Sequence, residues 1–306
     1  MIGQSRDRAA SRPRLSPEPG SGLAVEAGPE LWAVRGGSIG LDRPAVLGVL
    51  NLTPDSFSDG GKIRGVEEAL NEGIRMREEG ADLIDVGGES SRPGAHPVNA
   101  EEEWARIGAT VGALAVAGLQ VSVDTTKREV ARRSIDAGAV AINDISGLRD
   151  DSAIADLCGR TGAGLVIMHM RGNPGTMQEN TRYQDLFGEI SGALERSATL
   201  AVEHGVRAEQ IVVDPGIGFG KSVAGNLEII AHGGRFCSGR YPVMLGPSRK
   251  SFLGKLLDVD VDERLEGTIA ACVAGLMAGA RLFRVHDVLP VRRALDVAWA
   301  VHEVGH

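Results

Sequence analysis

The sequence predicts an α/β protein of the TIM (β/α)8 barrel class, and three observations support that prediction. Short apolar runs alternate with longer segments of helical periodicity, and this pair repeats eight times from Pro44 onward without a break in composition. Each short run is mostly apolar, as strands covered on both faces require. The repeat fills about 260 residues, close to the roughly 250 residues that are typical of such barrels.

A doubly wound open sheet is the competing α/β fold. It would be expected to carry a phosphate-binding GxGxxG turn after its first strand, whereas the turn here reads NLTPDSFSDGG from Asn51. The barrel is therefore preferred. Residues 1–28 contain Pro13, Pro17 and Pro19 and little periodic apolar content, which predicts a disordered N-terminal arm. The barrel is then expected to be a single domain over residues 29–306.

Strands and helices are expected in alternation along the chain. The eight predicted strands, all short and rich in aliphatic residues, are Ala45–Leu50, Leu83–Val86, Gln120–Val123, Val140–Ile142, Gly164–Met168, Gln210–Val213, Pro242–Leu245 and Leu282–Val285. The segments between them have the apolar periodicity of helices that cover a sheet on one face. They include Val66–Glu79, Glu101–Ala117, Arg128–Ala137, Leu186–His204, Gly267–Ala280 and Leu289–Val304.

Composition and charge exclude several classes of protein. The 306-residue chain is 42% hydrophobic and 24% charged, which is enough to bury a large core. Its formal net charge of −8 disfavours binding to nucleic acid, whose phosphates would be repelled. Three widely spaced cysteines indicate neither a disulfide framework nor a zinc site. Because no apolar run could span a bilayer and no signal-peptide core is apparent, a cytoplasmic protein without membrane partners is expected.

Polar residues stand at the carboxyl end of nearly every predicted strand. They are Asn51, Asp85, Asp124, Asn143 with Asp144, His169, Asp214, the run Ser248-Arg249-Lys250, and Arg284 with His286. Any one of them could be a helix cap or a turn residue, since Asp, Asn and Ser favour such positions. A series that also includes Lys, Arg and His indicates a shared site, because the carboxyl ends of barrel strands meet at one mouth where active sites are built.

The basic residues of this series predict an anion site. Arg284 and His286 at the last strand, together with Arg92 in the loop after the second strand, form a cationic set that suits the oxygens of a phosphate or diphosphate. Asn51 offers a neutral oxygen, which suits a Mg²⁺ held mostly by substrate phosphates and water. From the residues alone, Asn51 could equally be a turn residue.

Two carboxylates and an amide, Asp124, Asn143 and Asp214, are expected to face the barrel interior. A carboxylate buried without a partner is costly. These groups therefore either pair with Lys250 as a structural element or bind a ligand rich in N–H donors, such as the edge of a guanidine-like heterocycle. Both interpretations stay open at this point.

The segment DPGIGFGK at residues 214–221 packs three glycines into five residues directly after a strand. Such a loop lets backbone N–H groups approach a ligand closely, or it is a tight turn. Its spacing differs from that of a P-loop. Lys221 is accordingly expected to be an ordinary solvated lysine.

Eight motifs, in order and each at a predicted strand end, resemble those of the dihydropteroate synthases, the folate-pathway enzymes inhibited by sulfonamides. They are GVLNLTPDSFSDGG (48–61), DVGGESSRPG (85–94), SVDT (122–125), NDISG (143–147), MHMRG (168–172), DPGIGFGK (214–221), SRKSF (248–252) and RVHD (284–287). The resemblance implies a transferase that condenses 7,8-dihydropterin-6-ylmethyl diphosphate with 4-aminobenzoate to 7,8-dihydropteroate and diphosphate. It further implies Mg²⁺ as cofactor, a dissociative mechanism, a homodimer packed through C-terminal helices, and sensitivity to sulfonamides.

The resemblance also implies roles for individual residues. The catalytic set would be Asn51, Asp124, Lys250, Arg284 and His286. The pterin ring would be held by Asp124, Asn143, Met168, Asp214, Phe219, Lys250 and Arg284. The diphosphate would be bound by Asn51, which is also the Mg²⁺ ligand, and by Ser91, Arg92, Arg284 and His286. The 4-aminobenzoate pocket would be formed by Phe57, Ser91, Pro93, Lys250 and Ser251, with Asp59 in a loop that closes over the site.

Two other functions are compatible with part of this pattern. A methyltetrahydrofolate-type methyltransferase barrel would share the Asp and Asn contacts to a pterin but has no need for the diphosphate set of Arg92, Arg284 and His286. A non-catalytic paralogue that binds pterin without turnover would be expected to lose pieces of the loops, and none is missing from this sequence. Both are therefore less favoured than the synthase.

Overall fold

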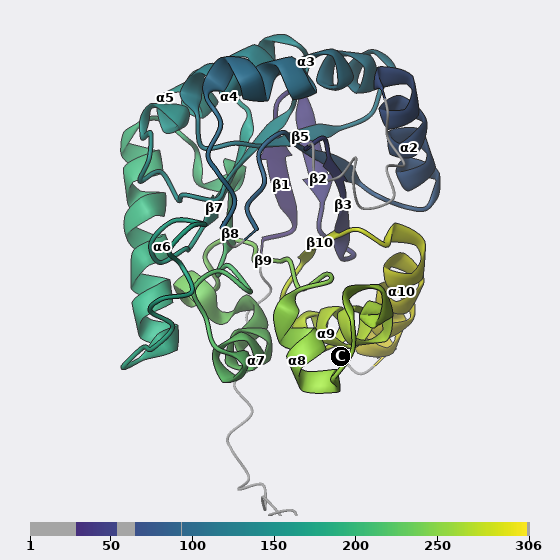
Figure 1. Cartoon of the computed structure of the whole chain (residues 1–306), viewed down its shortest axis with the longest axis vertical. Helices are drawn as coiled ribbons and strands as arrows, with labels where there is room; N and C mark the ends of the chain where they lie inside the picture. Colours follow the sequence, from purple (N-terminus) through teal and green to yellow (C-terminus); the bar gives the residue numbers. More distant parts are fainter. Residues whose placement is uncertain (1–28, 54–64, 93, 305–306) are drawn as a thin grey trace, which may run out of the picture.

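The computed structural model of the chain describes residues 29–53, 65–92 and 94–304. Its centre is a barrel of eight parallel strands, which Figure 1 shows with helices around it. The barrel strands are β3 (Ala45–Asn51), β4 (Leu83–Gly87), β5 (Val121–Asp124), β6 (Ala141–Asp144), β7 (Gly164–Met168), β8 (Ile211–Asp214), β9 (Met244–Leu245) and β10 (Leu282–Val285). The predicted fold class is confirmed, and each predicted strand overlaps an observed one.

The strands pair in the order β8-β7-β6-β5-β4-β3-β10-β9. A parallel bridge between Val213 and Val243 joins the two strands at the ends of this order, so the barrel is nearly closed. β9 is two residues long, shorter than the four-residue strand predicted from Pro242. Proline has no N–H to give to a ladder, and Pro242 contributes its carbonyl oxygen, which accepts a hydrogen bond from Val213 N at 3.0 Å.

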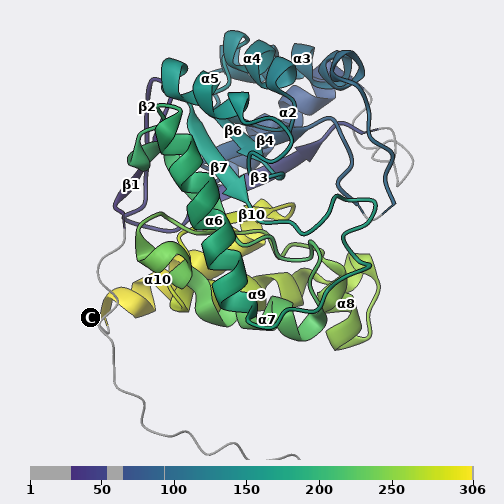
Figure 2. The same ribbon diagram turned by 90° about the vertical axis from the view of Figure 1, so that its left-hand side faces the viewer.

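Helices follow the strands and cover the outside of the barrel. They are α2 (Val66–Glu78), α3 (Ala100–Val116), α4 (Arg128–Asp136), α5 (Ala153–Thr161), α6 (Leu186–Glu203), α7 (Val223–His232), α8 (Ser251–Leu257), α9 (Leu265–Met277) and α10 (Val288–Val304). Figure 1 shows α3 to α5 on one side of the barrel and α8 to α10 on the other, and the long α6 crosses the side that faces the viewer in Figure 2. In the part of the chain that the structure describes, no helix has the length and apolar character needed to cross a membrane.

A hairpin that the sequence did not predict seals the amino-terminal end of the barrel. Its strands, β1 (Leu31–Val34) and β2 (Gly37–Gly40), pair antiparallel. Trp32 is fully buried against the first interior side chains of the barrel strands, and its indole N–H donates to Gln210 O at 2.8 Å. A Cβ at Gly164 would lie 2.8 Å from the Trp32 ring, so glycine is needed where β7 begins.

The barrel interior changes from apolar to polar two residues further along several strands. Side chains alternate between the faces of a strand, so the residue two positions after an interior one also points inward. The interior apolar cluster under the hairpin includes Leu83, Ala141, Val212 and Leu282. Two positions later in the same strands stand Asp85, Asn143, Asp214 and Arg284. The fold thus places a layer of polar side chains at the carboxyl end of the barrel, directly above an apolar layer.

Candidate active site

Arg284 lies at the centre of a network of ion pairs inside the barrel. Its Nε donates to Asp85 Oδ2 at 2.6 Å, and its Nη2 donates to Asp124 Oδ2 at 2.9 Å. Asn143 Nδ2 donates to the same Asp85 oxygen at 3.2 Å. Asp85 and Asn143 are buried, and within the described part of the chain the second carboxylate oxygen of Asp85 and the amide oxygen of Asn143 have no hydrogen-bond partner. Four strands, β4, β5, β6 and β10, therefore contribute to one cluster, and Asp85 and Arg284 are 199 positions apart in the sequence.

The charges in this network shift one another's protonation. Burial raises the pKa of Asp124 to about 7; the Arg284 guanidinium acts in the opposite direction, and Asp85 adds to the rise. Burial opposes the charge of Arg284, but the two carboxylates outweigh it and raise its pKa. Arg284 is thus a permanent cation, whereas Asp124 changes its charge near neutral pH.

Asp214 ends β8 and belongs to a tightly turned loop. Its Oδ1 accepts a hydrogen bond from Gly216 N at 2.6 Å, which fixes the carboxylate. Gly216 has a φ of +73°, a backbone conformation that favours glycine, and a Cβ there would lie 2.0 Å from His169 O. Burial raises the pKa of Asp214, while Lys221, Lys250 and Arg284 act to lower it.

Lys250 and Phe219 form one wall of the same mouth. The Lys250 ammonium lies 3.9 Å from the centre of the Phe219 ring, a cation–π contact. Burial lowers the pKa of Lys250 to about 8, and Arg284 acts in the same direction. Phe219 also belongs to a small apolar cluster with Met168, which ends β7 in register with Asp214 of β8. No ion pair joins Lys250 to Asp214 or Asp124 in the part of the chain described here. The interpretation of Lys250 as a structural partner of these carboxylates is therefore not supported by a direct contact.

The expectation that Lys221 is a solvated lysine is wrong. Its side chain is buried, and its Nζ donates to Phe219 O at 2.9 Å and to His169 O at 3.0 Å. The His169 Nδ1 lies 3.0 Å from the same Nζ. Gly216, Gly218 and Gly220 all have positive φ, so the chain turns back toward the barrel before Lys221, which the comparison with a P-loop does not indicate.

His286 is a neutral imidazole in contact with Ser248. The Ser248 Oγ accepts a hydrogen bond from His286 N at 3.2 Å and lies 3.0 Å from His286 Nδ1. Burial lowers the pKa of His286 to about 3, with Arg284 adding to the effect, so the ring is neutral and carries one proton, on Nδ1 or on Nε2. Arg249, between Ser248 and Lys250, instead pairs with Asp287 through two hydrogen bonds of 3.0 and 2.6 Å.

The remaining predicted residues lie at the rim or outside the described residues. Asn51 ends β3 in register with Gly87 of β4 and is partly buried. Ser91 is partly buried, and Arg92 and Ser251 are exposed, the latter as the first residue of α8. Phe57, Asp59 and Pro93 lie outside the described residues, as does the predicted arm 1–28.

A second ion cluster, which the sequence reasoning missed, lies at the base of the loop after β4. Lys127 donates to Glu103 Oε2 at 2.6 Å and also pairs with Glu89, which precedes Ser90 and Ser91 in that loop. Glu103 is fully buried on α3, and burial raises its pKa. Lys127 and both glutamates line a cavity of about 390 Å³ that also reaches Asp124. No sequence signal marked this cluster, because the three residues come from three separate segments.

The donors of the described residues do not form a protein-only metal site. No group of three or more His, Cys, Asp and Glu side chains there could hold a metal ion. Asn51 supplies a single neutral oxygen, which fits a Mg²⁺ whose other ligands are phosphate oxygens and water.

Comparisons with known proteins agree with this site. The family model described as "Pterin binding enzyme" matches residues 47–286. The dihydropteroate synthase of Escherichia coli K12 is 42% identical over 267 residues, which cover 87% of this chain and 94% of that protein.

Two solved structures match in three dimensions as well. The Yersinia pestis dihydropteroate synthase with a sulfonamide drug complex has a TM-score of 0.85 and 39% identity, covering 89% of this chain and 99% of that one. The Burkholderia cenocepacia enzyme complexed with 7,8-dihydropteroate has a TM-score of 0.81 and 37% identity, covering 91% and 99%. The fold, the polar layer of the barrel and these matches over most of the chain show that it belongs to the dihydropteroate synthases, a family of pterin-binding enzymes.

Proposed function

We propose that the chain condenses 7,8-dihydropterin-6-ylmethyl diphosphate with 4-aminobenzoate, and that its polar layer binds the ring while its rim binds the diphosphate. The observation that carries this assignment is the separation of charge at one mouth: buried acceptors gather around Asp214 and Asn143, and cations gather around Arg284 and Lys250. A ligand with a donor-rich ring and an anionic tail matches both groups.

The pterin ring is assigned to the interior acceptors. The fixed Asp214 carboxylate would accept hydrogen bonds from the 2-amino group and the adjacent ring N–H, in two parallel contacts. The unpartnered amide oxygen of Asn143 is a buried acceptor that a ring donor would satisfy. Asp124 would accept a further ring N–H while it is ionised, and the Arg284 guanidinium would stack on the ring plane. The apolar walls would be Met168 and Phe219, with Lys250 above the latter.

The diphosphate is assigned to the rim of β3, β4 and β10. Arg92 and Ser91 would contact it from the loop after β4, and Arg284 from the interior. His286 is neutral; Ser248 Oγ would donate to its Nδ1, and its Nε2–H would then donate a hydrogen bond to a phosphate oxygen. Asn51 would hold Mg²⁺, which neutralises charge on the departing diphosphate when it is bound.

The 4-aminobenzoate pocket is assigned to the edge formed by α8 and the loops after β3 and β4. Lys250 and Ser251 would receive the carboxylate, since one supplies positive charge and the other a hydroxyl at the rim. Ser91 and Pro93 would line the opposite side. Phe57 and Asp59 are assigned to the closing loop by the resemblance alone.

The chemistry follows from these fixed charges. Loss of diphosphate leaves positive charge on the pterin-methyl group, and the neighbouring carboxylates Asp124 and Asp214 would stabilise it. Arg284, Arg92 and His286 would stabilise the departing anion. Because these groups are held by hydrogen bonds within the protein, their orientation costs little at the moment of reaction, which is electrostatic preorganisation. The weakly nucleophilic aromatic amine would then attack without a covalent enzyme intermediate.

The direct test is incubation of purified protein with the pterin diphosphate, labelled 4-aminobenzoate and Mg²⁺. Labelled dihydropteroate is expected together with released diphosphate, and background levels of both would overturn the proposal. The residue assignment is tested by Asp214→Ala, which removes a charged acceptor worth roughly 1.5 to 3 kcal/mol and should weaken pterin binding about 10- to 100-fold in calorimetry. Asp136→Ala, on the exposed end of α4, is the matched control, and unchanged affinity in Asp214→Ala would refute the role of Asp214.

We further propose a cytoplasmic homodimer packed through the C-terminal helices. Three exposed valines of α10, Val297, Val301 and Val304, follow one another at intervals of four and three residues and thus share one helix face. An apolar face of this kind is a candidate for association. Light scattering should give about twice the chain mass, and Val301→Asp should lower it to that of one chain; a monomeric wild type would refute the proposal.

A further inference from the structure

Lys221 is a buried amine whose Nζ has three hydrogen-bond partners. Its side chain is 4% exposed, and its Nζ lies 2.9 Å from Phe219 O, 3.0 Å from His169 O and 3.0 Å from His169 Nδ1. An ammonium carries three N–H donors. All three contacts are satisfied at once if Lys221 is charged and the His169 Nδ1 has its lone pair free, which places the ring proton on Nε2.

The charge of Lys221 acts on Asp214. Within the described residues, Lys221 has no carboxylate at ion-pair distance. Burial lowers the pKa of Lys221 well below its ordinary value, and the negative charge of Asp214 opposes that effect. Three cations act on Asp214 in return: Lys221, Lys250 and Arg284. Lys221 is the one of these three for which the proposed reaction gives no substrate contact. A buried charge is costly unless its environment compensates it, so its retention here requires an explanation.

The same side chain ties two site-bearing segments together. His169 directly follows β7, and its backbone N–H donates to Asp214 O at 2.8 Å. Phe219, the other carbonyl partner, carries the ring beneath Lys250. Gly216, whose N–H fixes the Asp214 carboxylate, passes so close that a Cβ there would lie 3.0 Å from Lys221 Nζ. Lys221 therefore fixes the turn that determines where the Asp214 carboxylate points.

We propose that Lys221, together with a neutral His169, is a positioning residue for the pterin site: it holds the Asp214–Gly220 turn in place and favours the ionised form of the Asp214 carboxylate. The proposal rests on the proposed function, because it assumes that Asp214 accepts hydrogen bonds from the pterin. It assigns no contact between Lys221 and substrate. A merely structural lysine would affect folding but would not affect the protonation of Asp214.

The test compares Lys221→Met and Lys221→Gln with the wild type. Met removes charge and donors, whereas Gln retains a donor for a backbone carbonyl but not the charge. Affinity for 6-hydroxymethylpterin is measured by calorimetry from pH 5 to 9. All proteins in this comparison also carry Asp124→Asn, so that Asp124 no longer titrates and the change with pH reports on Asp214. Both variants should move the acidic midpoint of binding upward by about one pH unit, since an opposite charge nearby typically shifts a carboxylate by 1 to 3 units. Lys255→Met, on the exposed side of α8, is the control and should leave the midpoint unchanged.

Steady-state kinetics add a second measurement. The KM for the pterin diphosphate should rise about tenfold in the folded Lys221 variants, while the KM for 4-aminobenzoate stays within twofold of the wild type. Folded variants with the wild-type pH midpoint and KM would overturn the inference and leave the proposed function intact. A wild type that binds no pterin at any pH would instead overturn the proposed function.

A measurement on the unaltered protein decides the matter if neither variant folds. Nitrogen NMR of histidine-labelled protein reports the tautomer and the titration of each imidazole. Burial and Lys221 lower the pKa of His169 to about 3, so His169 should remain neutral with its proton on Nε2 over pH 5 to 9. A proton on Nδ1, or protonation of His169 near pH 6.5, would refute the pairing with a charged Lys221.

Discussion

Replacing Asp85 should destabilise the protein more than replacing any exposed carboxylate, although Asp85 has no assigned contact with substrate. Asp85→Ala leaves two buried donors, Arg284 Nε and Asn143 Nδ2, without the oxygen that now accepts from both at 2.6 and 3.2 Å. Breaking one side of a buried ion pair typically costs about 3 to 5 kcal/mol. Asp85→Asn keeps an oxygen for these donors but loses the charge, so about 1 to 2 kcal/mol is expected, the difference between charged and neutral hydrogen bonds.

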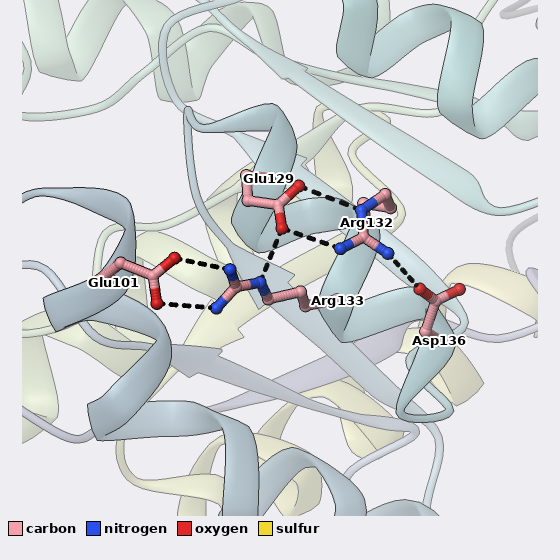
Figure 3. A network of polar contacts seen from close by, with 5 residues as sticks. All are labelled: Glu101, Glu129, Arg132, Arg133 and Asp136. Atoms are coloured by element: carbon pink, nitrogen blue, oxygen red, sulfur yellow. Dashed lines mark hydrogen bonds and ion pairs between the residues drawn. The ribbon is translucent and has the colours of Figure 1, made fainter.

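The assay is urea unfolding of both variants at one pH, with free energies extrapolated to water. Asp136→Ala is the control, because Asp136 belongs to the exposed network of Glu101, Glu129, Arg132 and Arg133 on α3 and α4 that Figure 3 shows. Its side chain is 64% exposed, and its removal should cost less than about 1 kcal/mol. We expect the free energy of unfolding to fall most in Asp85→Ala, less in Asp85→Asn and least in Asp136→Ala. An Asp85→Ala variant within about 1 kcal/mol of the wild type would refute the reasoning that Arg284 depends on this carboxylate.

Three further predictions follow from the site. Because the pKa of Asp124 is about 7, about a tenth of it remains ionised at pH 6, so pterin affinity in calorimetry should fall about tenfold from pH 8 to pH 6. Asp124→Asn should abolish this tenfold fall in affinity, and an equally steep pH profile in the variant would refute the assignment of the fall to Asp124. Ser248→Ala removes the hydroxyl partner of His286 Nδ1, so kcat/KM for the pterin diphosphate should fall about tenfold, and no change would contradict the proposed donor role of His286. Lys127→Met frees Glu89 at the base of the loop after β4, which carries proposed contacts to both substrates, so the KM values for the pterin diphosphate and for 4-aminobenzoate should both rise; unchanged KM values would contradict the loop assignment.

The barrel and most of its polar layer were predictable because their signals are local. Gly164–Met168 and Leu282–Val285 are observed with the predicted bounds, since a strand buried on both faces is a short apolar run that needs no knowledge of its neighbours. Asp124 and Asp214 were identified for the same reason: each interrupts such a run at its carboxyl end. The barrel topology then brings these ends together without further information from the sequence.

The hairpin at residues 31–40 could not be predicted in this way. Its strands have four residues each and include two glycines in β2, so neither gives a clear period. A two-stranded hairpin is marginal alone and gains its stability from burying Trp32 under the barrel. The hairpin depends on the absence of a side chain at Gly164, which makes room for the Trp32 ring. Gly164 is 132 positions from Trp32 in the sequence, so this relation is recognisable only once the fold is known.

The sequence also did not predict which charged residues pair with one another. Asp85 and Arg284 were each noted as strand-end residues, but the pairing depends on both occupying the same interior layer. Lys221 was predicted to be solvated, as an isolated lysine after glycines usually is. The direction of its side chain depends on the positive φ angles of the three preceding glycines, which the sequence pattern does not give. Sequence pattern therefore predicted which residues face the mouth, but not which of them neutralise one another.

That neutralisation supports the proposed binding of a neutral ring and an anion at one mouth. The mouth of the barrel holds three carboxylates and three cations: Asp85, Asp124, Asp214, Lys221, Lys250 and Arg284. Asp214 and Arg284 are fixed at different places in this mouth, because Gly216 N holds the first and Asp85 holds the second. A bond that breaks into a cation and an anion between such groups gains stabilisation at both ends. In water the same gain would require solvent to reorient, whereas here the orienting hydrogen bonds are already made within the protein.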